Sequence, residues 1–153
     1  MSINLYILFR VKYILEPANC PKGWNQIADR CFIYDAALRN YHNSSQYCKD
    51  IGGMIASVHS ETENSFMLSL FPVDNGTIVY IGAEYKNEQW KWHDGSPWWQ
   101  PSKNGGLSGH ETRIGVNCPH CGNDGLWHDW GNGEAEFGVI CTLNLGNEGI
   151  TFQ

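Results

Sequence analysis

Charged residues are scarce in this sequence, and charges of one sign never gather into a run. Asp, Glu, Lys and Arg make up only 17% of the 153 residues, and the formal net charge is −6. A weakly acidic chain without a basic cluster is a poor binder of nucleic acid or anionic membranes. Because the sequence also holds 17 glycines, short elements joined by turns are expected instead of long solvated helices.

Long hydrophobic runs are also absent. The most apolar segment is residues 1–15, which Arg10 and Lys12 interrupt. Its uninterrupted part, residues 3–9, is far shorter than the roughly 20 apolar residues that span a bilayer. It is also at the lower limit of a signal-peptide core, with no basic residue before it and no small-residue cleavage site after it. Three interpretations of residues 1–16 stay open: a degenerate signal peptide, an additional strand, or an incorrect start. No other segment could cross a membrane.

Tryptophan and cysteine are plentiful by contrast, with seven Trp and six Cys. An even number of cysteines spread along a chain of this size is typical of an oxidising compartment. N-glycosylation sequons begin at Asn43 and Asn75, which agrees with a secretory route. We therefore expect a secreted, disulfide-stapled glycoprotein. Its cysteines are Cys20, Cys31, Cys48, Cys118, Cys121 and Cys141.

Two short helices are predicted. Asn43 followed three residues later by Gln46 is a capping-box pattern, and Ser60 followed by Glu63 is a second one. Two glycines end the first helix and a proline ends the second. Cys48 lies on the buried face of the first helix, where a structural half-cystine is expected.

Short strands and one long loop account for most of the remaining chain. Runs of β-branched, aromatic or alternating residues predict strands, at residues 77–82, 89–93, 126–130 and 137–142. Residues 95–117 show no periodicity, and a long loop inside a compact domain is usually functional. Cys20 and Cys31 could close a small loop or hairpin, which would stabilise the fold by about 3 kcal/mol. The predicted class is α+β.

Six motifs follow one another in a distinctive order. They are Cys20-Pro21-x-Gly23-Trp24, Tyr47-Cys48, Tyr80-Ile81-Gly82, Trp90-x-Trp92 with Asp94-Gly95-Ser96, Gly125-Leu126-Trp127-His128-Asp129 and Val139-Ile140-Cys141. Each motif alone is weak, but chance would have to place all of them in one order. Together they resemble the C-type lectin-like domain family over about residues 20–142.

The resemblance implies a domain over residues 17–144, followed by a polar tail of residues 145–153. The expected C-type lectin-like fold has two short helices, small antiparallel sheets and a long irregular loop. The two ends of the domain lie next to each other in this family. The resemblance also implies a bridge between Cys48 and Cys141, which would stabilise the fold by about 4–5 kcal/mol in the loop-entropy model.

One cysteine departs from the family pattern. In the family the cysteine at position 118 pairs with one near position 132, where this sequence has Asn132. We expect a short Cys118–Cys121 bridge instead, which adds little loop entropy. Thiol–disulfide catalysis by this pair would need a helix N-terminus, and glycines follow it. Zinc is a further alternative, with ligands from the two cysteines and from His110, His120 or His128. A binding module, not an enzyme, is therefore expected.

This sequence has the expected residue types at only some of the family's calcium-ligand positions. In sugar-binding members they come from a proline triplet, a Glu before the loop-end Cys, and the Asn and Asp of a Trp-Asn-Asp motif. Here the triplet is Gln100-Pro101-Ser102, Val116 occupies the Glu position, and His128 replaces the Asn, while Asp129 is retained. Calcium prefers six to eight oxygens, several of them charged. Gln100, Ser102 and Asp129 therefore make a poor calcium site, to which Glu111 could add an oxygen after rearrangement.

We expect a carbohydrate-recognition module whose calcium site is weakened or lost. The peptide bond before Pro101 could be cis, and Asp124 could join a rebuilt calcium site. Sugar could also stack on exposed tryptophans without calcium. The alternative is a lectin-like domain that binds a protein ligand through the same loop, because Trp and Tyr anchor such interfaces. The candidate ligand-binding residues are Trp98, Gln100, Ser102, Asn104, Glu111, His128, Asp129 and Trp130.

Overall fold

The computed structural model describes residues 19–73, 76–121 and 123–146. The predictions for residues 1–16, for the sequon at Asn75 and for residues 147–153 lie outside these ranges. The helices are α2 (Tyr41–Asp50) and α3 (Glu61–Ser69). The strands are β1 (Asn25–Ile27), β2 (Arg30–Arg39), β3 (Met54–Ile55), β4 (Val79–Lys86), β5 (Gln89–Trp92), β6 (Arg113–Val116), β7 (Trp127–Asp129) and β8 (Phe137–Asn144).

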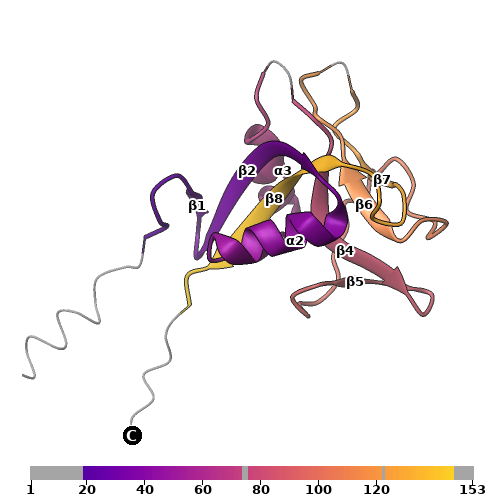
Figure 1. Cartoon of the computed structure of the whole chain (residues 1–153), viewed down its shortest axis with the longest axis horizontal. Coiled ribbons are helices and arrows are strands. Elements are labelled where there is room, and N and C mark those ends of the chain that lie inside the picture. Colours follow the sequence, from indigo (N-terminus) through magenta and orange to yellow (C-terminus); the bar gives the residue numbers. More distant parts are fainter. Residues whose placement is uncertain (1–18, 74–75, 122, 147–153) are drawn as a thin grey trace, which may run out of the picture.

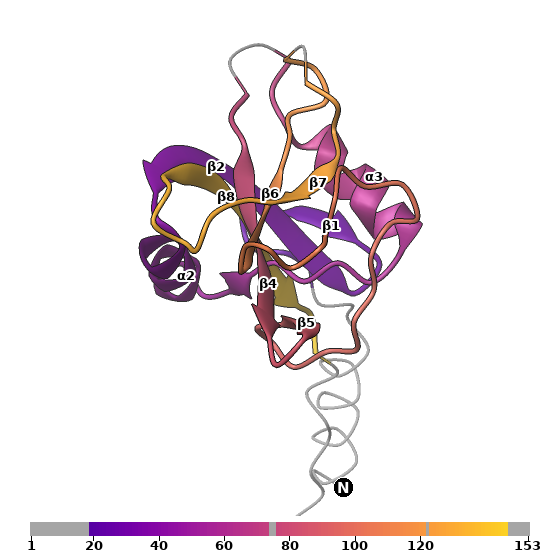
Figure 2. The same cartoon turned by 90° about the vertical axis from the view of Figure 1, so that its right-hand side faces the viewer.

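One sheet forms the centre of the described fold, with its main strands in the order β1-β2-β8-β4-β6-β7. Strand β3 pairs with β8 and β5 with β4. Helices α2 and α3 lie on opposite sides of β2 and β8 (Figures 1 and 2). The predicted α+β class is therefore confirmed, and neither described helix has the length and apolar character needed to cross a bilayer.

The named strands pair antiparallel, as expected, except that β4 and β8 pair in parallel. Gly138 faces this junction: a Cβ atom there would lie 2.7 Å from Thr77 Cγ2 and 2.8 Å from the Asp35 carbonyl oxygen. The close approach of the three segments therefore requires a glycine. Strand pairing over such sequence distances leaves no trace in local periodicity, so the sequence did not predict this junction.

The predicted N-terminal cap is confirmed for one helix and wrong for the other. Helix α3 is capped as expected, with Ser60 Oγ accepting from the Glu63 amide at 3.1 Å. The predicted capping box at Asn43 is wrong. Helix α2 begins at Tyr41, and the side chain of Asn40 is the cap, accepting from the Asn43 amide at 2.9 Å. Asn40 has no Glu or Gln three residues later, so the capping-box pattern overlooked it.

The expected long loop of residues 95–117 is also shorter than predicted. Its last part forms strand β6, which pairs with both β4 and β7. Ile114 and Val116 are fully buried in the core, in a strand of four residues, which is the shortest run in which a period of two can be recognised. The loop proper therefore ends at about residue 112.

Disulfides join distant parts of the fold. Cys48–Cys141 links α2 to β8 across 93 residues, as the resemblance implied. Cys20–Cys31 closes the N-terminal hairpin, and Cys118–Cys121 forms the short bridge. All six cysteines are bonded. The ends of the domain lie next to each other, as expected, since Arg30 pairs with Asn144.

Candidate functional site

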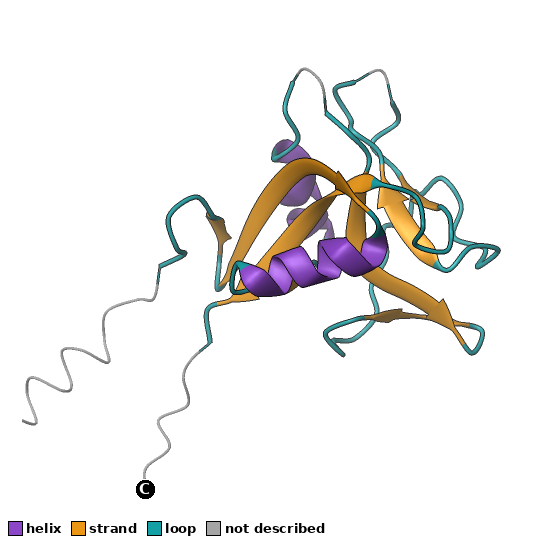
Figure 3. Cartoon of the chain, in the orientation of Figure 1, coloured by secondary structure: helices purple, strands orange, loops and turns teal. Residues whose placement is uncertain are grey.

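The long loop folds back along strand β7. The Gly105 amide donates to the Trp127 carbonyl at 2.8 Å, and the Asp129 amide donates to the Gly106 carbonyl at 3.0 Å. These bonds make the loop an additional edge of the sheet at β7, and loops gather at this end of the molecule (Figure 3). The candidate residues of the loop and of β7 are thereby brought to one region of the surface.

Asp129, which matches the acidic residue of the family's Trp-Asn-Asp motif, holds the loop in place. Its Oδ2 atom accepts from Ser108 Oγ at 3.0 Å and from the Gly109 amide at 3.1 Å. Gly109 has a φ of +79° and packs against the ring of Tyr85. One carboxylate oxygen of Asp129 is therefore already occupied by the chain itself.

The polar residues around Pro101 are partly occupied as well. Gln100 Oε1 accepts from Trp98 Nε1 at 3.1 Å. Asn104 donates to the Pro101 carbonyl at 3.3 Å and accepts from the Gly106 amide at 3.1 Å. The described peptide bonds are all trans, so the suggested cis bond at Pro101 is wrong here. Ser102 is exposed at the surface.

His128, at the position where the family has asparagine, is hydrogen-bonded to Asp124. His128 Nε2 lies 2.8 Å from Asp124 Oδ2. The Asp124 Oδ1 atom accepts from Asn117 Nδ2 at 2.7 Å and from the Leu126 amide at 2.9 Å. These bonds lower the pKa of Asp124 to about 2, and the hydrogen bond from Asn117 has the largest effect. Asp124 is therefore ionised at any physiological pH.

The imidazole of His128 is enclosed between two groups. On one face the indole of Trp130 stacks at a centroid distance of 4.7 Å, with the ring planes 10° apart. Gly105 lies against the ring as well, because a Cβ atom at that position would be 1.9 Å from His128 Cε1. His128 is consequently fixed in orientation, and only a part of its surface remains open to a ligand.

The two candidate tryptophans are half-buried. Trp98 packs on the rings of Trp92 and Trp90, with centroid distances of 4.5 and 6.0 Å. Trp130 stacks on His128 and approaches Phe137 at 6.2 Å. Each ring therefore offers an edge or part of a face to the solvent, and not a free platform.

The sequence did not predict the structural roles of several residues at the site. Asn117 and Gly105 had no assigned role, although the first holds Asp124 and the second admits the ring of His128. Asp124 was considered only as an additional calcium ligand. Glu111 is exposed, and the hydrogen bonds of the described residues do not tie it to the other candidates.

Comparison with known proteins identifies a matching family and individual relatives. The Lectin C-type domain model matches residues 22–143. A type-2 ice-structuring protein of Hemitripterus americanus is 36% identical over 83 residues, which is 53% of this chain and 48% of that protein. A lectin of Pleurodeles waltl is 29% identical over 136 residues, covering 80% of this chain and 75% of its own. Asialoglycoprotein receptor 1 of Mus musculus is 27% identical over 120 residues, covering 74% and 41%.

Solved structures agree on the fold. A calcium-independent type II antifreeze protein superposes with a TM-score of 0.68 at 25% identity, over 85% of this chain and 98% of that one. Human lithostathine superposes with a TM-score of 0.70 at 22% identity, over 82% and 91%. The chain spans less than half the length of the ice-structuring protein and of the receptor. Because the family model covers most of its length, this chain belongs to the C-type lectin domain family.

Proposed function

We propose that this protein is a secreted carbohydrate-recognition module that works without a calcium ion at its long loop. The family match and the relatives named as lectins support carbohydrate as the ligand class. Three disulfides support secretion, because such bridges persist in oxidising compartments. The sequon at the exposed Asn43 is proposed to be glycosylated.

The observation that carries the proposal is the donor set at the calcium position. Val116 is buried and offers no side-chain oxygen. His128 offers a nitrogen and is paired with Asp124. Gln100 and Asp129 each use an oxygen for a bond within the protein. Calcium binds six to eight oxygens, several of them charged, and this set does not fit it.

A neutral sugar can be held by other means at this surface. Gln100, Ser102 and Glu111 are exposed, and amide, hydroxyl and carboxylate groups bond well to sugar hydroxyls. The exposed edges of Trp98 and Trp130 supply apolar contact for the C–H groups of a sugar ring. Binding by these groups alone is expected to be weak for one sugar, so several contacts must act together.

A glycan array probed with the secreted protein in the presence of a calcium chelator tests this proposal. We expect a subset of glycans to bind, with signals unchanged when calcium replaces the chelator. Signals that appear only with calcium would show that loop oxygens rebuild a metal site. A blank array under both conditions would contradict carbohydrate as the ligand and favour a protein partner.

Ice is a second candidate ligand, because relatives by sequence and by structure are named as ice-structuring or antifreeze proteins. The structural relative is named as calcium-independent, in line with the donor set described above. Thermal hysteresis of a concentrated solution of the protein is the discriminating measurement. A gap between freezing and melting temperatures that grows with protein concentration would favour ice, and its absence would leave carbohydrate.

A further inference from the structure

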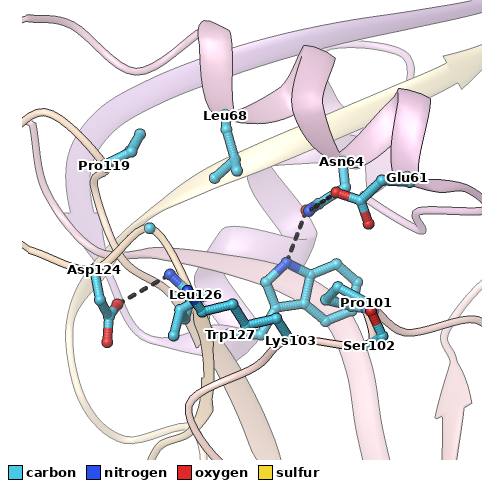
Figure 4. A pocket seen from close by; sticks show the side chains of 11 residues that line it. Glu61, Asn64, Leu68, Pro101, Ser102, Lys103, Pro119, Asp124, Leu126 and Trp127 are labelled. Carbon is cyan, nitrogen blue, oxygen red and sulfur yellow. Dashed lines mark hydrogen bonds between the residues drawn. The ribbon is translucent and has the colours of Figure 1, made fainter.

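A cleft lies beside the site, between helix α3, the long loop and the segment that precedes β7. Its volume is about 300 Å³. Helix α3 contributes Glu61 and Leu68, and the long loop contributes Lys103 (Figure 4). The segment before β7 contributes Pro119 and Asp124. Ligand sites in proteins range upward from roughly this volume, so the cleft is large enough for one sugar ring.

The lining of the cleft combines apolar and polar groups. Leu68, Pro101 and Leu126 give it apolar surface. Figure 4 shows Glu61 and Asp124 on opposite sides, with Trp127 between them. The indole of Trp127 is fully buried and donates to Asn64 Oδ1 at 3.0 Å, so this part of the lining is rigid.

Charges of both signs meet at the rim. Glu61 accepts hydrogen bonds, Lys103 donates them, and the Ser102 hydroxyl does both. All three side chains are exposed. An anion would be repelled by the two carboxylates, whereas sugar hydroxyls can donate to the carboxylates and accept from the lysine. The lining therefore suits a neutral pyranose, with its C–H groups on the apolar side chains.

The short disulfide builds one wall of this cleft. Pro119 stands inside the Cys118–Cys121 ring and packs closely on Gly125, where a Cβ atom would lie 3.0 Å from Pro119 Cβ. The other departures from the family pattern lie close by. His128 and Asp124 are two of them, and Asp124 lines the cleft itself.

Asp124 joins the cleft to the site already described. Its carboxylate lines the cleft, and its Oδ2 atom contacts His128 Nε2 at 2.8 Å. Ser102 also lines the cleft and belongs to the proline triplet of the loop. A ligand spanning both surfaces would therefore cross Asp124.

We propose that this cleft is a subsite for one pyranose ring of a neutral oligosaccharide, whose adjacent ring lies on the surface of Gln100, His128 and Trp130. The proposal rests on the proposed carbohydrate function and states where the ligand extends. It also gives the Cys118–Cys121 bridge a role, which is to hold the wall of the subsite in place.

The test uses the neutral di- to tetrasaccharide that gives the strongest array signal, and the monosaccharides that compose it. Affinities are measured by NMR titration for the wild type and for the double variant Glu61→Ala/Lys103→Ala. The matched control is Thr62→Ala/Lys91→Ala, which changes exposed neighbours outside the cleft. We expect the double variant to bind the oligosaccharide about tenfold more weakly, to bind the monosaccharides as the wild type does, and the control to be unchanged.

Two further readouts separate the cleft from the fold. The indole N–H signal of Trp127 should shift with the oligosaccharide and not with the monosaccharides, because Asn64 transmits contact at the cleft to it. The variant Cys118→Ala/Cys121→Ala should lose the same affinity for the oligosaccharide while keeping a cooperative unfolding transition.

If the wild type binds glycans and Glu61→Ala/Lys103→Ala binds the oligosaccharide equally well, the cleft is not a subsite. The proposed function would then remain intact. Failure of the wild-type protein to bind any glycan would overturn both.

Discussion

His128 is held by contacts with the protein itself. The ring lies against Gly105 and Trp130 and bonds to Asp124. The hydrogen bond to Asp124 and the stacking on Trp130 fix the orientation of the ring. The sequence predicted that His128 would weaken a calcium site, but not that Asp124 would be its partner. Asp124 lies in the irregular segment before β7 and His128 lies in β7 itself, so their spacing of four residues has no helical meaning.

Gly105→Ala tests the enclosure of His128. The added methyl group would overlap the imidazole, and the ring cannot retreat from it without pressing on the stacked indole of Trp130. Overpacking of this kind costs about 1–3 kcal/mol, which corresponds to a melting temperature several degrees lower. Thermal unfolding measures it, with Ser102→Ala as the control on an exposed neighbour. An unchanged melting temperature would contradict the close packing of residue 105 on residue 128.

The acid limb of stability tests Asp124. Folding lowers its pKa to about 2 from the ordinary 3.8, so its ionised form stabilises the fold. That contribution is complete above about pH 4 and is lost as the pH falls toward 2. Because 42% of the side chain is exposed, solvent screening keeps it below about 1 kcal/mol. Urea unfolding of Asp124→Asn and wild type should differ at pH 7 and converge near pH 2. A difference that stays constant with pH would contradict the lowered pKa.

At the scale of elements, local signals succeeded and long-range ones did not. Ser60 and Glu63 predicted the start of α3 correctly, because both partners of the capping hydrogen bond lie within one helical turn. Strand β6 escaped detection because its burial comes from β4 and β7, which are distant in sequence. The parallel pairing of β4 and β8 depends on close packing at Gly138, which no local pattern expresses.

Helix α2 offers a matched test of its capping residue. Asn40→Ala removes the side chain that accepts from the Asn43 amide and should lower the free energy of unfolding by about 1 kcal/mol. Asn43→Ala keeps that backbone donor and should change it by a few tenths at most. Urea unfolding decides between them, with both variants made in a host without N-glycosylation because Asn43 lies in a sequon. Equal losses would place the cap elsewhere.

At the scale of the whole molecule, the disulfides close loops of very different size. The bonded cysteines are 93 residues apart in Cys48–Cys141, 11 in Cys20–Cys31 and 3 in Cys118–Cys121. The long bridge followed from the family resemblance and not from spacing, since six cysteines allow fifteen pairings. It joins the first helix to the last strand and so constrains nearly the whole domain.

Replacing each bonded pair by alanines should rank the bridges by loop size. The loop-entropy model gives losses of about 5 kcal/mol for Cys48–Cys141, about 3 for Cys20–Cys31 and about 2 for Cys118–Cys121. Urea unfolding of the three double variants measures the order. A larger loss from Cys118–Cys121 than from Cys48–Cys141 would contradict the role of the short bridge as a local wall of the cleft.

We propose above that this lectin domain holds its binding surface without calcium. The most direct measurement is the melting temperature of the wild-type protein in about 5 mM calcium and in chelator. A ligand present at a hundred times its dissociation constant stabilises the folded state by about 2.7 kcal/mol, which would raise the melting temperature by several degrees. We predict equal melting temperatures, because the donor set around Asp129 does not fit the ion. A rise of several degrees in calcium would contradict the account.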